Sequence, residues 1–166
     1  MSEPEAAFEP LDELDQKLLA RLMRQGRATW ADLADELGVT APAIAQRVRR
    51  LEDRGVIRQF AAWVAPEAVA PVTAWVAVRL DRADQREHFH QRALESDAIQ
   101  ECHRVTGDDD YLLKVRCASV AALDEFLSIT LARWPGVGRT RASLVLATVK
   151  DTPVLPLPDG KKKKKN

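Results

Sequence analysis

The chain has 166 residues, which is enough for one compact domain or two small ones. Hydrophobic residues make up 46% and charged residues 30%, a globular balance that fits neither a disordered chain nor a membrane protein. The acidic start MSEPEAAFEP is unlike a secretory signal, and no apolar run approaches the roughly 20 residues of a membrane helix. We therefore expect a cytoplasmic protein with no membrane partner.

Net charge is formally zero, but five of the 25 basic residues form the run Lys161–Lys165, so residues 1–160 carry 20 basic against 25 acidic side chains. Global charge gives no sign of nucleic-acid binding, which has to be sought locally. The two cysteines, Cys102 and Cys117, do not form a C-x-x-C pair. Their spacing indicates neither a disulfide framework nor a zinc site, and we expect no metal ion and no cofactor.

Three helices are predicted near the N-terminus. The first covers roughly residues 12–25, where leucines recur at the spacing of one buried helical face. Thr29 is a favourable N-cap for a short second helix that Gly38 ends, and Thr40 caps a third helix that Gly55 closes. The turn of about three residues between the second and third helices is typical of a helix-turn-helix.

The periodicity changes after the third helix. Residues 56–64 have strand character, and we assign residues 11–64 to a winged helix-turn-helix domain. Residues 65–71 contain two prolines and are interpreted as a linker.

From residue 72 the predicted order is strand, helix, strand, strand, helix, strand, which is the βαββαβ order of a ferredoxin-like fold. These elements are expected at residues 72–81, 84–96, 99–106, 111–117, 120–134 and 138–150. The fold class is therefore α+β, with the ferredoxin-like domain over residues 72–150. Residues 151–166 are assigned to a C-terminal tail outside the fold.

The predicted sheet has apolar residues on both of its faces, although the helices of this fold cover only one. In the first strand Trp75 and Ala77 oppose the alternating core residues. In the last strand Val145, Ala147 and Val149 oppose residues 142, 144 and 146. An uncovered apolar face of this size predicts a homodimer that packs sheet against sheet. The alternative is a solvated face with scattered small apolar residues.

Basic side chains concentrate in and just after the third helix, where five arginines lie within twelve residues. If Ile44, Val48 and Leu51 point inward, the rotation of about 100° per residue turns a strip outward, toward a DNA major groove. That strip consists of Ala43, Gln46, Arg47 and Arg50.

The flanking arginines Arg49, Arg54 and Arg58 suit phosphates, and Thr40 marks a helix N-terminus whose backbone N–H groups suit them too. Several alanines in the helix indicate that DNA shape carries part of the specificity. The alternatives are a merely solvated arginine face and a protein-interaction module. We favour double-stranded DNA, because capping, turn and basic strip coincide.

The segment Gly107–Tyr111 (GDDDY) is the best ligand candidate in the second half. Its glycine permits a left-handed turn, exposed amides can receive a carboxylate, and the aspartates can accept an ammonium group. The alternatives are an ordinary polar hairpin turn and a weak divalent-cation site.

Two stretches resemble the Lrp/AsnC family of leucine-responsive, or feast/famine, transcription regulators. LDELDQKLLARLMRQGRATWADLADELGVTAPAIAQRVRRLEDRGVIRQFAAWV is similar to the family's DNA-binding half. ECHRVTGDDDYLLKV, followed by LARWPGVGRTRASLVLATVK, is similar to its effector-binding half.

The resemblance implies a transcription regulator whose ferredoxin-like domains dimerise through their sheets. It further implies that dimers assemble into octamers and bind amino acids between dimers. By this resemblance Gly107, Asp108 and Asp110 match the effector loop, with Tyr111 beside them and Ser143 as a second candidate contact.

Two other functions are compatible with this architecture. Sirohaem decarboxylases share the two-domain plan, but they carry a histidine- and asparagine-rich segment where this chain has Gln59–Trp63, which offers no acid–base group. We therefore expect no enzyme. A nucleoid-architectural protein without effector control is the other alternative, and the response of DNA binding to amino acids would separate it from a regulator.

Overall fold

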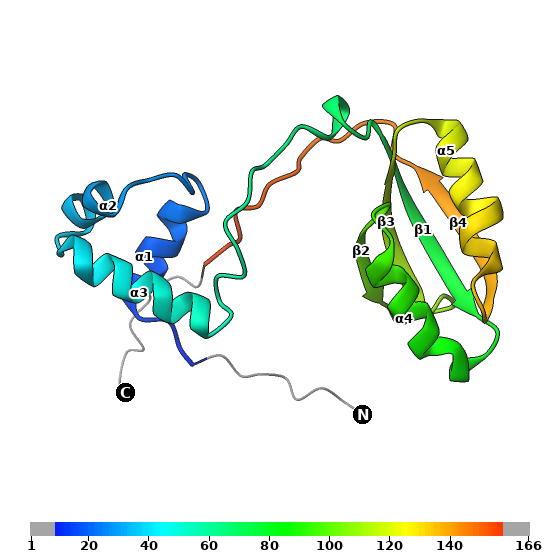
Figure 1. Ribbon diagram of the computed structural model, residues 1–166, viewed down its shortest axis with the longest axis horizontal. Coiled ribbons are helices and arrows are strands. Elements are labelled where there is room, and N and C mark those ends of the chain that lie inside the picture. The colour runs from blue at the N-terminus through cyan, green and yellow to red at the C-terminus, as the bar shows by residue number, and fades with distance from the viewer. Residues whose placement is uncertain (1–8, 158–166) are drawn as a thin grey trace, which may run out of the picture. The chain divides into compact units, whose positions relative to one another are not determined.

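The computed structural model describes residues 9–157, which form two compact units (Figure 1). Unit 1 contains the described residues up to Ala62 together with those from Lys150 onward, and unit 2 contains Trp63–Val149. The chain therefore passes from one unit to the other twice. The Lys161–Lys165 run lies outside the described residues.

Unit 1 contains the three expected helices, which are α1 (Glu13–Leu22), α2 (Trp30–Leu37) and α3 (Ala41–Asp53). Capping side chains fix where they begin. The Asp12 carboxylate accepts from the Asp15 N–H at 2.7 Å, and Thr29 Oγ1 accepts from the Asp32 N–H at 3.1 Å. Gly38 ends α2 with φ of 68°, a left-handed conformation that favours glycine.

The core of unit 1 draws on all three helices. It consists of Leu18, Leu19, Leu22, Leu33, Ala34, Ile44, Val48 and Leu51. The chain from Lys150 also belongs to this unit, because Leu157 packs against its core and the Leu155 N–H donates to Met23 Sδ at 3.3 Å. The described part of the expected tail, residues 151–157, is thus attached to the helical unit.

The strand expected at residues 56–64 is not formed, so within the described residues no paired wing follows α3. The N–H groups of Val56 and Ile57 instead donate to the Leu51 carbonyl oxygen, at 2.9 and 3.1 Å, and close the end of α3. The rest of the segment is extended and exposed, with no neighbouring strand to form a ladder. Within the expected linker, Pro66–Ala68 form a single 3₁₀ turn.

Unit 2 is a four-stranded antiparallel sheet with the order β2-β3-β1-β4, and α4 and α5 cover one of its faces (Figure 1). The strands are β1 (Val72–Leu80), β2 (Ile99–Arg104), β3 (Tyr111–Cys117) and β4 (Val137–Leu144). The helices are α4 (Arg86–Glu95), which follows a 3₁₀ turn at Ala83–Gln85, and α5 (Val120–Glu125). This arrangement confirms the ferredoxin-like prediction.

The last helix is shorter and less regular than the single helix expected over residues 120–134. After α5 the backbone widens into a π-helical segment, Phe126–Thr130, and then tightens into a 3₁₀ turn, Leu131–Arg133. Phe126, Leu131 and Trp134 are all buried in the core of unit 2. The change of pitch keeps these three large side chains on the sheet.

The face of the sheet away from the helices, called the open face below, is less apolar than the sequence suggested. β4 ends at Leu144, so Val145, Ala147 and Val149 lie beyond the strand. By register, the open-face residues of β4 are Arg139, Arg141 and Ser143. The apolar part of the open face is a centre formed by Trp75, Ala77 and Leu112 on β1 and β3.

Candidate DNA-binding surface and effector loop

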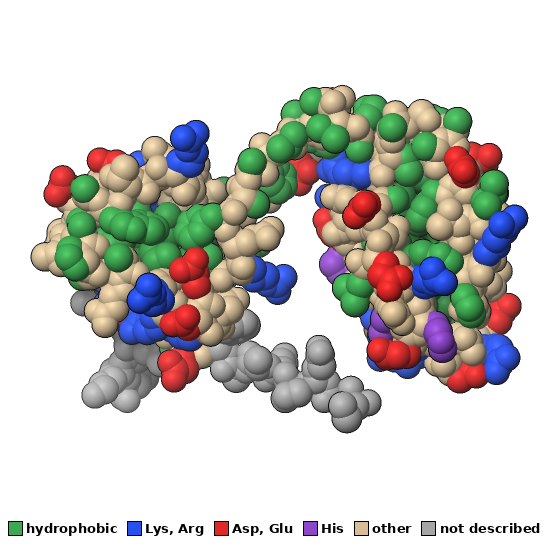
Figure 2. All heavy atoms as spheres, viewed as in Figure 1, with side chains coloured by type: hydrophobic (Ala, Val, Ile, Leu, Met, Phe, Trp, Pro, Cys, Tyr) green, Lys and Arg blue, Asp and Glu red, His purple; other side chains and the backbone are tan. Residues whose placement is uncertain are grey.

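The turn before α3 and the buried side chains of α3 determine which side of this helix faces solvent. The Gly38–Thr40 turn separates α2 from α3, and Thr40 Oγ1 accepts from the Ala43 N–H at 3.4 Å. Ile44 and Leu51 are completely buried and Val48 nearly so, which fixes the rotation of α3 about its axis. Figure 2 shows basic and acidic side chains side by side over this helix.

Arg47, expected to point outward, turns toward the start of α1. One nitrogen of its guanidinium lies 2.6 Å from the Asp12 carboxylate and 2.7 Å from the Asp15 carboxylate. The reason is angular: Arg47 follows Ile44 by three residues and so points only about 60° away from the buried direction. The expected strip of Ala43, Gln46, Arg47 and Arg50 is therefore divided, because Arg47 belongs to the contact between helices.

Two further arginines, Arg50 in α3 and Arg54 at its end, also bind the segment at and before the start of α1. The Arg50 guanidinium donates to both oxygens of Asp15, at 2.9 and 3.1 Å, and the Arg54 guanidinium donates to the Glu9 carbonyl oxygen at 2.5 Å. Arg47, Arg50 and Arg54 are called the arginine stripe below. Its spacing of three and four residues places all three members on one side of α3.

The contact between Asp12 and Arg47 affects the pKa values of both groups. The backbone N–H of Asp15, followed by the Arg47 guanidinium, holds the pKa of Asp12 below its ordinary value. Hydrogen bonds to Asp12 and then Asp15 raise the pKa of Arg47. Both groups of the Asp12–Arg47 pair are therefore charged at neutral pH.

The outward side of α3 carries Gln46 and Arg49, both exposed. Neither Arg49 nor the exposed Arg58 makes a hydrogen bond or ion pair with any residue from 9 to 157. Thr40 is exposed at the helix start, and Ala43 is half-buried. Eight residues were proposed from the sequence as a DNA-binding surface. The ones whose side chains make no bond to the segment from Glu9 to Asp15 are Thr40, Ala43, Gln46, Arg49 and Arg58.

The hairpin between β2 and β3 contains the predicted effector loop. Gly107 has φ of 117° and open space beside it, and Asp108 is exposed. Asp110 is anchored to β1: its carboxylate accepts from the Leu80 N–H, and its own N–H donates to the Val78 carbonyl oxygen, both at 2.9 Å. Asp110 therefore holds the loop on the sheet, while Asp108 presents its carboxylate to solvent.

Tyr111 is a core residue and does not belong to the loop surface. It is almost completely buried, and its hydroxyl lies 2.7 Å from His90 Nε2 on α4, the side of the sheet that the helices cover. The physical reason is strand alternation, since Tyr111 is opposite Val78, another core residue.

A cationic group beside this loop was not identified from the sequence. Asp109 lies 2.7 Å from the Arg141 guanidinium and 3.6 Å from that of Arg139, and the Arg79 guanidinium donates to the Asp108 carbonyl oxygen at 3.3 Å. The alternation in VGRTRAS, which sends Arg139 and Arg141 to one face, was the available signal. Ser143 lies on this same open face, opposite Trp75.

Three charged or titratable side chains contact one another on the β2 and β3 part of the open face. Glu101 lies 3.0 Å from Lys114 Nζ and 3.0 Å from His103 Nε2, and Lys114 Nζ lies 5.9 Å from the centre of the Trp75 ring. A hydrogen bond from His103, more than the one from Lys114, holds the pKa of Glu101 below its ordinary value. His103 is thus an exposed side chain whose ring nitrogen contacts a carboxylate on its own strand.

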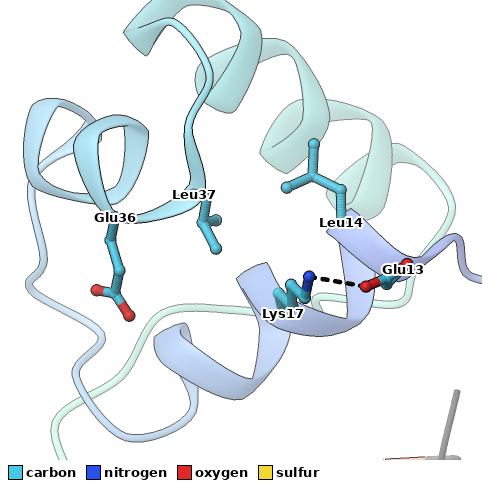
Figure 3. A pocket seen from close by; sticks show the side chains of 5 residues that line it. All are labelled: Glu13, Leu14, Lys17, Glu36 and Leu37. Carbon is cyan, nitrogen blue, oxygen red and sulfur yellow. Dashed lines mark ion pairs between the residues drawn. The ribbon is translucent and has the colours of Figure 1, made fainter.

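An open depression of about 420 Å³ lies between α1 and α2 (Figure 3). Leu14 and Leu37 form its apolar part, while Lys17 Nζ is bound to the Glu13 carboxylate at 2.7 Å. α3 contributes no residue to it. Within residues 9–157 we find no group of three metal-ligating side chains, and no helix there could cross a membrane.

A helix-turn-helix unit connected to a ferredoxin-like sheet is the architecture of DNA-binding regulators that carry a separate ligand domain, and of the sirohaem decarboxylases considered above. Comparison with known families supports the regulator class for both units. An AsnC-type helix-turn-helix domain matches residues 11–52, and an Lrp/AsnC ligand binding domain matches residues 73–155.

Individual proteins that are similar to this chain support the same family. The leucine-responsive regulatory protein of Haemophilus influenzae is 41% identical over 150 residues, which cover 89% of this chain and 90% of the relative. The protein of that name from Escherichia coli strain K12 is 37% identical over 145 residues, which cover 86% and 88%. The crystal structure of a Neisseria meningitidis transcriptional regulator in complex with L-Met has a TM-score of 0.83 and 32% identity, covering 89% of this chain and 97% of that one.

The chain belongs to the Lrp/AsnC family. It is a transcription regulator with a DNA-binding helix-turn-helix and a ligand-binding domain. The relatives named above are transcription regulators, which favours this function over the sirohaem decarboxylase considered from the architecture.

Proposed function

We propose that this protein is a cytoplasmic regulator that reads specific DNA sites through α3 and responds to an amino acid bound at the β2–β3 loop. The observation that carries the DNA part is the exposed pair Gln46 and Arg49, presented on a helix whose rotation the core fixes. Gln can bond an adenine edge and Arg a guanine edge, so we assign Arg49, which was predicted from the sequence to contact phosphates, to base reading beside Gln46. Thr40, Ala43 and Arg58 border this surface, and the arginine stripe supports it from the α1 side.

The effector part rests on the chemistry of the loop. Asp108 offers a free carboxylate for an ammonium group, while Gly107 and the neighbouring arginines offer N–H donors for a carboxylate. An L-Met complex of a regulator 32% identical to this chain agrees with an amino acid as the ligand class.

The assembly part rests on the open face. Its apolar centre, Trp75, Ala77 and Leu112, is covered by no described element of the chain, and a second copy would bury it. We propose a homodimer through this face and assembly of dimers into octamers, with the effector closed in between dimers.

The test of the whole proposal is an electrophoretic shift titration on the upstream region of the protein's own gene, with each amino acid added in turn. A specific shift that one or a few amino acids alter supports a regulator. Specific binding that no amino acid changes would indicate an architectural protein and contradict the effector part.

Gln46→Ala is expected to lose about 1–3 kcal/mol of binding free energy on the specific site and little on random DNA, because a base-edge contact is lost. Arg58→Ala should weaken both duplexes alike and reduce the slope of log K against log salt by about 1, because a phosphate contact is lost. Fluorescence anisotropy on both duplexes measures these effects. Identical behaviour of the two variants would contradict this division of roles.

Asp108→Asn is expected to weaken amino-acid binding by about 1.5–3 kcal/mol, the usual value of a hydrogen bond to a charged group, while effector-free DNA binding stays the same. Calorimetry with a panel that includes L-methionine and L-leucine measures it. Asp124→Asn, an exposed change on α5, is the matched control. Equal ligand affinity for both variants would remove Asp108 from the site.

A further inference from the structure

The arginine stripe has a feature that DNA binding alone does not require. Every member is engaged by the segment from Glu9 to Asp15, through the Glu9 carbonyl oxygen, the Asp12 carboxylate and the Asp15 carboxylate. A guanidinium held by a carboxylate is partly neutralised before any phosphate arrives. The segment before and at the start of α1 therefore limits how much positive charge α3 offers to DNA.

The two aspartates differ in accessibility. The Asp15 side chain is only 1% exposed, so the carboxylate that binds Arg47 and Arg50 is itself shielded from solvent. The Asp12 side chain is 49% exposed and the Arg50 side chain 51% exposed, and Asp12 lies 2.6 Å from Arg47 and 4.0 Å from Arg50. An anion from solution can thus replace Asp12 but cannot replace Asp15.

We propose that Asp12 is an autoinhibitory residue, which competes with DNA phosphates for Arg47 and Arg50 and so weakens the phosphate-dependent part of DNA binding on every sequence. This inference rests on the proposed function of α3 as the DNA-reading helix. Asp12 would act on α3 through these arginines and would not touch DNA itself.

The physical reason is that specific and non-specific binding share one set of phosphate contacts. Non-specific binding comes almost entirely from cations that neutralise phosphates, so a carboxylate that occupies those cations lowers it directly. Specific binding adds contacts from Gln46 and Arg49, which Asp12 does not reach in the structure. Weakening the shared contribution lowers both affinities by the same factor, so the ratio of specific to random affinity is unchanged.

Asp12→Asn is the decisive variant, because asparagine is as good an N-cap as aspartate and the bond to the Asp15 N–H is kept. Only the charge is removed. We expect the full-length variant to bind a random duplex about two- to fivefold more tightly at low salt, the size of an exposed ion pair. The slope of log K against log salt should steepen by about 0.9, which is one additional phosphate contact. Affinity for the specific duplex should rise by the same factor, so that discrimination between the two duplexes stays the same.

Glu13→Gln is the matched control. It removes one negative charge from the same helical turn, but Glu13 pairs with Lys17 and not with the stripe. Asp12→Ser, which also keeps a capping oxygen, should repeat the effect of Asp12→Asn even if asparagine disturbs folding. In an Arg47→Gln, Arg50→Gln background Asp12→Asn should change nothing.

Three results would overturn the inference: an effect of Asp12→Asn no larger than that of Glu13→Gln, a gain on only one of the two duplexes, or weaker DNA binding by both Asp12 variants. Failure of the proposed function itself looks different. In that case the wild-type protein would show no preference for any specific duplex, whatever residue 12 is.

Discussion

Asp15→Ala is expected to lower the free energy of unfolding of unit 1 by about 2–4 kcal/mol. Asp15 is the only charged residue among those completely or nearly buried in the described chain, and two guanidinium groups lie on it at 2.7 and 2.9 Å. Alanine would leave both arginines without their shared partner. The loss stays below that of a fully buried pair, because Arg47 and Arg50 keep part of their surface in water and Arg47 retains Asp12.

Urea unfolding followed by far-ultraviolet circular dichroism measures this change. Asp35→Ala is the control, since it removes an exposed carboxylate from α2 and should stay within about 0.5 kcal/mol of the wild-type value. If the two variants were equally stable, the Asp15 contacts would contribute nothing, and α3 would owe its rotation to its apolar side chains alone.

Trp75→Glu is expected to raise the dissociation constant of the proposed homodimer by at least a hundredfold. The indole lies at the apolar centre of the open face, so its loss removes one of the largest apolar surfaces of the proposed interface and places a carboxylate there. Burying a charge in an interface costs several kcal/mol unless it finds a partner. Lys114, directly opposite on β3, would offset part of that cost.

Sedimentation velocity over a range of protein concentrations measures the dissociation constant. Trp30→Glu serves as the control, because Trp30 is an exposed tryptophan of similar size on α2 in the other unit. A Trp75→Glu protein that remained dimeric at the same concentrations as the wild type would show that the dimer uses a different surface.

The elements of both units could be predicted because each follows from local chemistry. Threonine caps, glycine ends and apolar spacing identified α2 and α3, and the GDDD turn identified the β2–β3 hairpin. The strand at residues 56–64 was predicted wrongly for the same local reason. A sequence shows β character, but a strand also requires a neighbour, and none is present in the described residues.

The residue types of the candidate site could be predicted from the sequence, but the hydrogen-bond partners of its side chains could not. The sequence shows five arginines near α3, yet it cannot show that Arg47 and Arg50 meet a carboxylate more than thirty residues earlier. The same limit applied to Asp109 and Arg141, which are joined only when β4 pairs with β1. Local patterns thus located the surfaces, and long-range pairing decided which side chains remain available on them.

Because the chain from Lys150 returns to the helical unit, the ligand-binding unit is an insertion within the DNA-binding unit and not an extension at its end. A fragment stopped at residue 62 would keep the eight buried core residues but would lose Leu157, which packs against them. The sheet unit, in contrast, is one continuous stretch with both of its ends leading to its neighbour. In genetic terms, exchange of ligand units between such regulators requires two junctions, near residues 62 and 150, for each recombinant protein.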